Sequence, residues 1–347
     1  MWKQDPYLKL EDPLLAEPQP RRRLWRALMI GGTVMAVAGV VVVVVDGVHV
    51  SAPHEDTSIP LPIQGAAQEA PWTGPRLRII NGCESDPLWI AGFAVASPIF
   101  KEDAKLAAGE SVDVPIPAEG LASTRFWPKW GCDASGQQCA IGQSGGPGES
   151  CSALGCAPPV DSKFEATFGC LPGTKECAHN PSAPTEALGP VDWWDVSQVD
   201  GWTLPYRVDV KGPCAAPRTI DCSRLALSQC PSAEALGDYG KQSLQLHDPA
   251  NKGAVVGCFS PCGKLTFSNW GQGFPNTPES EQARDYCCPT PPISPEACSS
   301  GPIVKSEYVR AVHKLCPSVY AYAYDDGVGL STCPAGTGYE VTFYCPA

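Results

Sequence analysis

Cysteine is missing from the first 82 residues of this 347-residue chain, yet eighteen cysteines follow from Cys83 onward. An even number of cysteines confined to one part of a chain predicts disulfide bonds, which persist in oxidising compartments outside the cytosol. This distribution argues against a cytosolic location for the C-terminal part of the chain.

An excess of positive charge is also lacking. Charged residues make up 18% of the chain, and residues 46–347 carry 19 basic and 33 acidic side chains, a net charge of −14. Proteins that bind nucleic acids or anionic membrane surfaces need clustered lysine and arginine. The charge balance argues against both kinds of partner, and no nucleic acid is expected as a ligand.

Metal-ligand spacing is absent as well. The five histidines form none of the spacings that zinc sites use, and the cysteines are expected to lie in disulfides. No Asn-x-Ser/Thr sequence with a non-proline centre occurs, so N-glycosylation is not expected. We expect neither a metal nor another cofactor.

One long run without charge lies at residues 27–45, ahead of every cysteine. As a helix, its 19 residues span roughly 28 Å, which matches a bilayer core of about 30 Å. By the positive-inside rule, the N-terminus is placed in the cytosol by four preceding arginines: Arg21, Arg22, Arg23 and Arg26. The run therefore predicts one transmembrane helix that is not cleaved. A long cleaved signal peptide is the alternative.

The anchor divides the chain into parts. Residues 1–26 would form a cytosolic tail, and residues 46–75, rich in proline and small polar residues, a flexible stalk. Residues 76–347 would form the folded part. We expect a single-pass type II membrane protein whose C-terminal part lies outside the cell or in an endomembrane or vacuolar lumen.

Proline and glycine are abundant, with 37 and 34 residues, which favours short strands and turns over long helices. A helix is predicted at 306–315, where Tyr308, Val309, Val312 and Leu315 fall at helical spacing. The predicted fold class is all-β. Alternating apolar and polar residues predict strands at 76–81, 88–95, 111–116, 202–210 and 339–344.

The most specific tract of the chain, residues 192–205, reads DWWDVSQVDGWTLP. It resembles the D-F-W-D-I-S-L-V-D-G-F-N-x-P segment of the thaumatin-like proteins. Further motifs of that family are matched in order by INGC at 80–83, WPKWGC at 127–132, DYCC at 285–288 and FYCP at 343–346. The resemblance covers 76–347 and implies a flattened β-sandwich with two disulfide-rich loop domains, a smaller one at 131–157 and a larger one at 223–315.

The resemblance also implies a disulfide pattern. Two cysteines have no counterpart in the family, and Cys170 and Cys177, close together inside an insertion, are expected to pair with each other. The family's eight bridges, carried over position by position, imply Cys83–Cys345, Cys132–Cys139, Cys151–Cys156, Cys214–Cys333, Cys222–Cys316, Cys230–Cys258, Cys262–Cys287 and Cys288–Cys298.

Thaumatin-like proteins carry an acidic cleft between the sandwich and the larger loop domain, and many bind or slowly hydrolyse β-1,3-glucans. A glycosidase needs one carboxylic acid to protonate the leaving oxygen and one carboxylate as base or nucleophile. The resemblance implies Glu165 as the acid and Asp195 as its partner. The matching cleft residues are Lys129, Glu165, Asp195, Asp200, and Asp325 or Asp326. Lysine replaces the family's arginine at position 129, and an ammonium lacks the forked geometry of a guanidinium.

Three functions follow from these observations. The first is a membrane-anchored, monomeric protein whose acidic cleft binds β-1,3-glucan-type polysaccharide, in defence or cell-wall remodelling. The second is a weak endo-β-1,3-glucanase. The third is a proteinaceous inhibitor or receptor module that uses loops, such as the 24 residues between Cys262 and Cys287 with Trp270 and Phe274. The aspartates could instead only cap turns.

Overall fold

The computed structural model describes residues 72–94, 103–145, 149–181, 183–215, 217–251 and 253–346. All of these residues belong to one compact unit. The predicted cytosolic tail, the predicted transmembrane helix at 27–45 and the stalk up to residue 71 lie outside the described residues. Among the residues described, no helix has the length and apolar character needed to span a bilayer.

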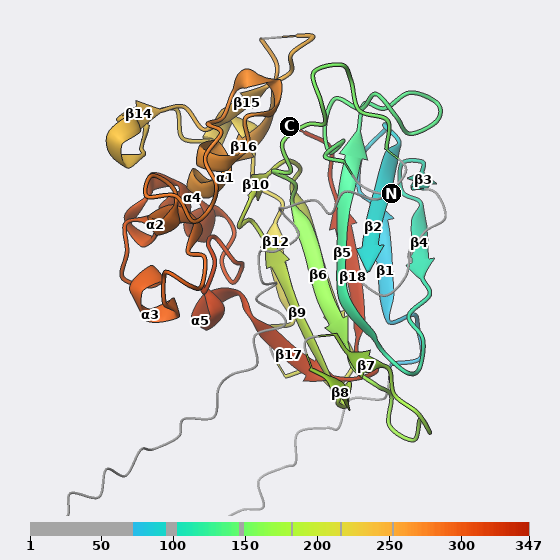
Figure 1. Ribbon diagram of the computed structural model, residues 1–347. Coiled ribbons are helices and arrows are strands. Elements are labelled where there is room, and N and C mark those ends of the chain that lie inside the picture. Colours follow the sequence, from blue (N-terminus) through green and yellow to red (C-terminus); the bar gives the residue numbers. More distant parts are fainter. Residues whose placement is uncertain are drawn as a thin grey trace, which may run out of the picture. The chain divides into compact units, whose positions relative to one another are not determined.

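Two β-sheets form the body of the described unit (Figure 1). The first sheet has the strand order β12-β11-β18-β1-β4. Its strands are β1 (Leu77–Asn81), β4 (Ser111–Val114), β11 (Tyr206–Lys211), β12 (Thr219–Cys222) and β18 (Gly338–Phe343). β1 and β18 run parallel, and the disulfide Cys83–Cys345 follows directly after both strands. The two ends of the folded unit are therefore joined covalently as well as by hydrogen bonds.

The second sheet has the strand order β17-β9-β6-β5-β2-β3. Its strands are β2 (Leu88–Ala94), β3 (Ala104–Leu106), β5 (Leu121–Trp130), β6 (Lys163–Phe168), β9 (Val191–Ser197) and β17 (Ser331–Pro334). Phe164 and Trp194 of this sheet pack against Tyr339 of the first sheet, with ring centroids 5.7 and 5.2 Å apart. Since side chains alternate along a strand, the odd-numbered residues of β6 and β9 point to the opposite face, which carries the candidate site.

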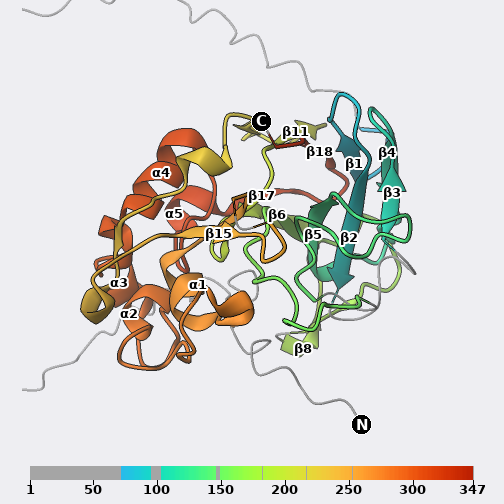
Figure 2. The same ribbon diagram turned by 90° about the horizontal axis from the view of Figure 1, so that it is seen from above.

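Short helices gather on one side of the sheets (Figure 2). The elements here are β10 (Gly201–Trp202), β13 (Glu234–Ala235), β14 (Lys241–Gln242), β15 (Gln245–His247), β16 (Val255–Phe259), α1 (Pro261–Thr266), α2 (Arg284–Cys287), α3 (Pro295–Cys298), α4 (Glu307–Leu315) and α5 (Asp326–Gly329). Ser306 caps α4 by accepting a hydrogen bond from the Val309 amide. The helix predicted at 306–315 thus forms, with Tyr308 and Val312 buried.

Pro205 interrupts one of the predicted strands. The single strand expected at 202–210 is wrong, because β10 ends at Trp202 and β11 begins only at Tyr206. Pro205 cannot donate a ladder hydrogen bond, so the chain leaves one sheet before it and joins another after it. β10 pairs with β16, whereas β11 pairs with β18.

Nine disulfides use all eighteen cysteines. Eight are the pairs that the family resemblance implies, and the ninth is the expected Cys170–Cys177. The Cys170–Cys177 bridge closes an insertion that continues into the hairpin β7 (His179–Asn180) and β8 (Ala183–Ala187). The insertion bonds to the loop before β5, since the amide of Ala178 donates to the carbonyl of Glu119 at 2.8 Å. It therefore extends one end of the sandwich and does not separate β6 from β9.

Candidate functional site

The central feature of the site is a row of three charged residues across three strands. Arg125 of β5 is paired with Glu165 of β6, and Glu165 is paired with Asp195 of β9. Directly opposed residues on one sheet face have Cβ atoms about 4.5–5.5 Å apart. The register therefore brings together the two carboxylates that the sequence analysis selected. We call Arg125, Glu165, Asp195 and their charged neighbours Lys163 and Asp200 the acidic face.

Burial keeps this row in a partly dry environment. Glu165 is 9% exposed and Asp195 only 2% exposed. Nε of Arg125 lies 3.6 Å from Oε1 of Glu165, and its guanidinium also lies over the ring of Phe93. An opposite charge at this distance is worth more in a partly buried site than in water. Arg125 thus helps to hold the carboxylate pair in place.

Asp200 extends the acidic face toward the larger loop domain. Its Oδ2 forms an ion pair with Nζ of Lys163, which is buried on the same face of β6 as Glu165. Burial alone would lower the pKa of Lys163, but the charges of Asp200 and Glu165 outweigh it and raise the pKa. Lys163 is therefore a charged link between two of the predicted site residues.

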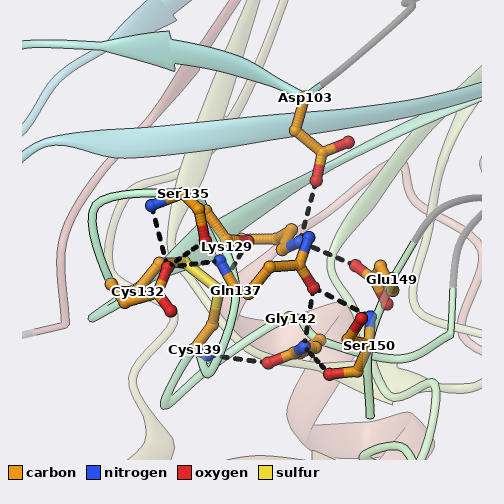
Figure 3. The surroundings of a disulfide bond; sticks show 12 residues. Asp103, Lys129, Cys132, Ser135, Gln137, Cys139, Gly142, Glu149 and Ser150 are labelled. Atoms are coloured by element: carbon orange, nitrogen blue, oxygen red, sulfur yellow. Dashed lines mark hydrogen bonds and ion pairs between the residues drawn. A yellow bond between two sulfur atoms is a disulfide. The ribbon is translucent and has the colours of Figure 1, made fainter.

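Lys129 does not take the position expected for it. Its ammonium is fully buried and lies 2.8 Å from Oδ2 of Asp103 and 2.8 Å from Oε1 of Glu149, as Figure 3 shows. Burial opposes its charge, but these two carboxylates raise its pKa. The cation beside Glu165 is Arg125, so the prediction of Lys129 opposite the acids is wrong. Lys129 instead ties the loop that carries Glu149 to β5.

Asp325 and Asp326 have different roles. Asp325 is 3% exposed, and its Oδ2 accepts a hydrogen bond from the Ala321 amide and lies 2.7 Å from Nε2 of His313. Asp326 is exposed and accepts a hydrogen bond from the Tyr320 hydroxyl at 2.7 Å. Burial raises the pKa of Tyr320, and the nearby charges of Asp195 and Asp326 raise it further. Asp326 is thus linked to the acidic face through Tyr320, whereas Asp325 fixes a turn.

Asp161 is a charged residue of this region that the sequence analysis missed. It is 3% exposed and accepts a hydrogen bond from the Ser144 hydroxyl. Burial raises its pKa to about 7, while Ser144 and Lys163 oppose the shift. A weak signal was present in the sequence, because Asp161 lies two residues before Lys163, where β6 begins, and four before Glu165, in step with strand alternation. The same alternation relates Arg125 to Lys129 in β5.

The raised pKa of Asp161 makes fold stability depend on pH. The folded state holds its proton up to about pH 7, whereas the unfolded chain releases it near the ordinary value of 3.8. The free energy of unfolding should therefore fall as pH rises from about 4 to 7, by on the order of 2–4 kcal/mol. Thermal unfolding at pH 5 and pH 8 measures this. Asp161→Asn should flatten the dependence, and an unchanged slope in that variant would refute the assignment.

The tryptophans near these positions divide into two groups. Trp194 and Trp202 are fully buried, and Trp127 is 5% exposed with its indole N–H donating to the carbonyl of Gly142. Trp130 and Trp193 are partly exposed. Only the last two could offer an aromatic ring to a ligand. In the part of the chain that the structure describes, no group of three or more His, Cys, Asp or Glu residues could hold a metal ion.

Comparison with known proteins identifies the family to which the chain belongs. The sequence profile described as the thaumatin family matches residues 81–346. A glucan endo-1,3-beta-glucosidase of Prunus avium is 31% identical over 243 residues, covering 69% of this chain and 76% of that protein. Thaumatin-like protein 1b of Malus domestica is 29% identical over 270 residues, 77% of this chain and 97% of that protein. Pathogenesis-related thaumatin-like protein 3.5 of Cryptomeria japonica is 30% identical over 244 residues, with coverage of 70% and 77%. The chain belongs to the thaumatin family.

Proposed function

We propose that this protein binds β-1,3-glucan-type polysaccharide through the acidic face, in a defence setting. The observation that carries the proposal is the row Arg125–Glu165–Asp195, which places a guanidinium and two carboxylates side by side on one sheet face. Sugar hydroxyls both donate and accept hydrogen bonds, and those to charged groups are the stronger ones. Relatives named as a glucan endo-1,3-beta-glucosidase and as a pathogenesis-related protein support the polymer and the setting.

Co-sedimentation of the full-length protein with insoluble β-1,3-glucan tests the proposal. Asp195→Asn removes one charged acceptor with little change in shape, so affinity should fall about 10- to 100-fold. Asp113→Asn is the matched control, because Asp113 is an exposed carboxylate of the first sheet paired with Arg78. Asp113→Asn should bind like the wild type. Equal binding by all three proteins would remove the acidic face from the proposal.

A weak endo-β-1,3-glucanase activity is the second candidate, and the opposed pair Glu165 and Asp195 favours it. A glycosidase needs two carboxyl groups that flank the scissile bond, and the register places Glu165 and Asp195 directly opposite each other on one sheet face. In this mechanism Glu165 protonates the leaving oxygen and Asp195 attacks the anomeric carbon. Glu165→Gln should lower the release of reducing ends by about 10²–10⁴-fold, more than the loss of glucan affinity that removing one charged acceptor would cause. Unchanged hydrolysis in that variant would end the assignment.

We further propose that residues 27–45 anchor the protein in a membrane with its C-terminal part outside the cytosol. The charge-free run after four arginines supports this orientation. The full-length protein should stay in the membrane pellet after alkaline carbonate washing, and replacing Val41 and Val43 by arginine should release it or block its export, because each central charge costs about 2.5–3.5 kcal/mol. A mature N-terminus beyond residue 46 would identify a cleaved signal peptide instead.

A further inference from the structure

A pocket of about 600 Å³ lies where the two loop domains meet, and none of its lining residues belongs to the acidic face. Leu154 comes from the smaller loop domain, and the other lining residues come from the larger one: His247, Pro249, Trp270, Gly271 and Gln272. Its size falls within the range of about 300–1,000 Å³ that is typical of small-molecule sites. Leu154 is 61% exposed, one of two large apolar side chains described as exposed.

Trp270 stands in an unusual backbone conformation beside this pocket. Its φ of 58° and ψ of 10° fall in the left-handed region, which a bulky residue rarely adopts. Two hydrogen bonds hold the loop that contains Trp270 against the smaller loop domain. The Trp270 indole N–H donates to the carbonyl of Gly155 at 3.3 Å, and the side-chain amide of Asn269 donates to the carbonyl of Cys156 at 3.0 Å. Strain of this kind persists where surrounding contacts fix it, often at ligand sites.

The residues that follow Trp270 are also fixed by contacts. The side-chain amide of Gln272 accepts from the His247 backbone N–H at 2.8 Å and donates to the His247 carbonyl at 2.6 Å. Phe274 stacks on Tyr239 with ring centroids 3.9 Å apart. The pocket is therefore preformed. Nδ1 of His247, however, is buried and makes no hydrogen bond, and such a group calls for a partner.

We propose that this pocket binds a neutral sugar ring, as a carbohydrate site separate from the acidic face. Its lining contains no aspartate, glutamate, lysine or arginine, so a charged ligand would find no counter-charge. Trp270, Leu154 and Pro249 offer apolar surface to the C–H face of a pyranose ring, and the polar side chains of His247 and Gln272 line the pocket beside it. The choice of a glucose-based ligand rests on the proposed function.

Trp270→Gly tests the proposal, because glycine adopts a positive φ without strain and removes the ring. Titration of the full-length protein with a β-1,3-linked glucose trisaccharide should show Kd about five- to tenfold higher in this variant. Its Tm should stay within about 5 °C of the wild type. Trp270→Phe, which keeps an aromatic ring, should retain most of the affinity. An unchanged Kd in Trp270→Gly, or a larger fall in its Tm, would overturn the site.

Asp195→Asn, titrated in parallel, separates this proposal from the proposed function. If only Trp270→Gly weakens trisaccharide binding, the pocket binds sugar and the acidic face does not. If only Asp195→Asn weakens it, the acidic face stands and the pocket proposal fails. If the two sites are independent, each single variant should lose one of two bound trisaccharides per protein, and the double variant should lose both.

Discussion

Replacing Arg76 by methionine is expected to lower the free energy of unfolding by about 3–5 kcal/mol, because it leaves a buried carboxylate without its cation. Nη2 of Arg76 lies 2.7 Å from Oδ1 of Asp192, whose side chain is fully buried between the sheets. The Gly169 amide and the Tyr339 hydroxyl also donate to Asp192. Urea unfolding of the oxidised protein at pH 7 measures the loss.

Arg78→Met is the matched control for this variant. Arg78 lies two residues further along and pairs with Asp113. The Arg78 side chain is 34% and the Asp113 side chain 51% exposed, and surface pairs of this kind are worth about 0–1 kcal/mol. Burial raises the pKa of Asp192 to about 6 even though Arg76 opposes it. The loss in Arg76→Met should therefore shrink as the pH falls through about 6, where Asp192 takes up a proton. Equal losses in the two variants would show that the buried pair has no special role.

Replacing Lys129 by methionine should also be strongly destabilising. Its fully buried ammonium sits between Asp103 and Glu149, and removal would leave two carboxylates facing each other without a cation (Figure 3). We expect a loss of about 3–5 kcal/mol, measured by urea unfolding. Variant protein that still folds should keep its affinity for β-1,3-glucan, because Lys129 does not contact Glu165 in the way Arg125 does.

Lys105→Met controls for the loss of a lysine in this region. Lys105 of β3 is exposed, with its ammonium over the ring of Trp89 at 5.2 Å, so its replacement should cost at most about 1 kcal/mol. If Lys129→Met unfolds like Lys105→Met but loses glucan binding, Lys129 belongs to the ligand site after all, as the sequence motif suggested.

Much of the fold could be predicted from the sequence, because strand alternation and the cysteine and motif pattern are visible in short stretches of the chain. Strand alternation located β1, β2, β4 and β18, whereas β5, β6 and β9, which carry the acidic face, were not predicted as strands. The pairing of Glu165 with Asp195 followed from the resemblance. The hairpin β7–β8 was missed, because its strands are short and mostly exposed and so lack an apolar alternation.

The partners of Lys129 could not be predicted in the same way. Asp103 and Glu149 come from loops 26 and 20 positions away, and nothing in the local pattern indicates that they converge on one ammonium. The motif placed position 129 in the cleft because the family has an arginine there. In this chain Arg125, four positions earlier on the same face of β5, lies beside Glu165, and only the sheet register reveals this.

The most direct test of the proposed function is a map of backbone amide NMR shifts as a β-1,3-linked glucose hexasaccharide is added to the full-length protein. Shifts should concentrate on β5, β6 and β9 around Arg125, Glu165 and Asp195, and should disappear in Asp195→Asn. Amides of the first sheet, such as those around Asp113, should not move. Shifts that avoid the acidic face, or the absence of any shift at millimolar sugar, would contradict glucan binding by this face.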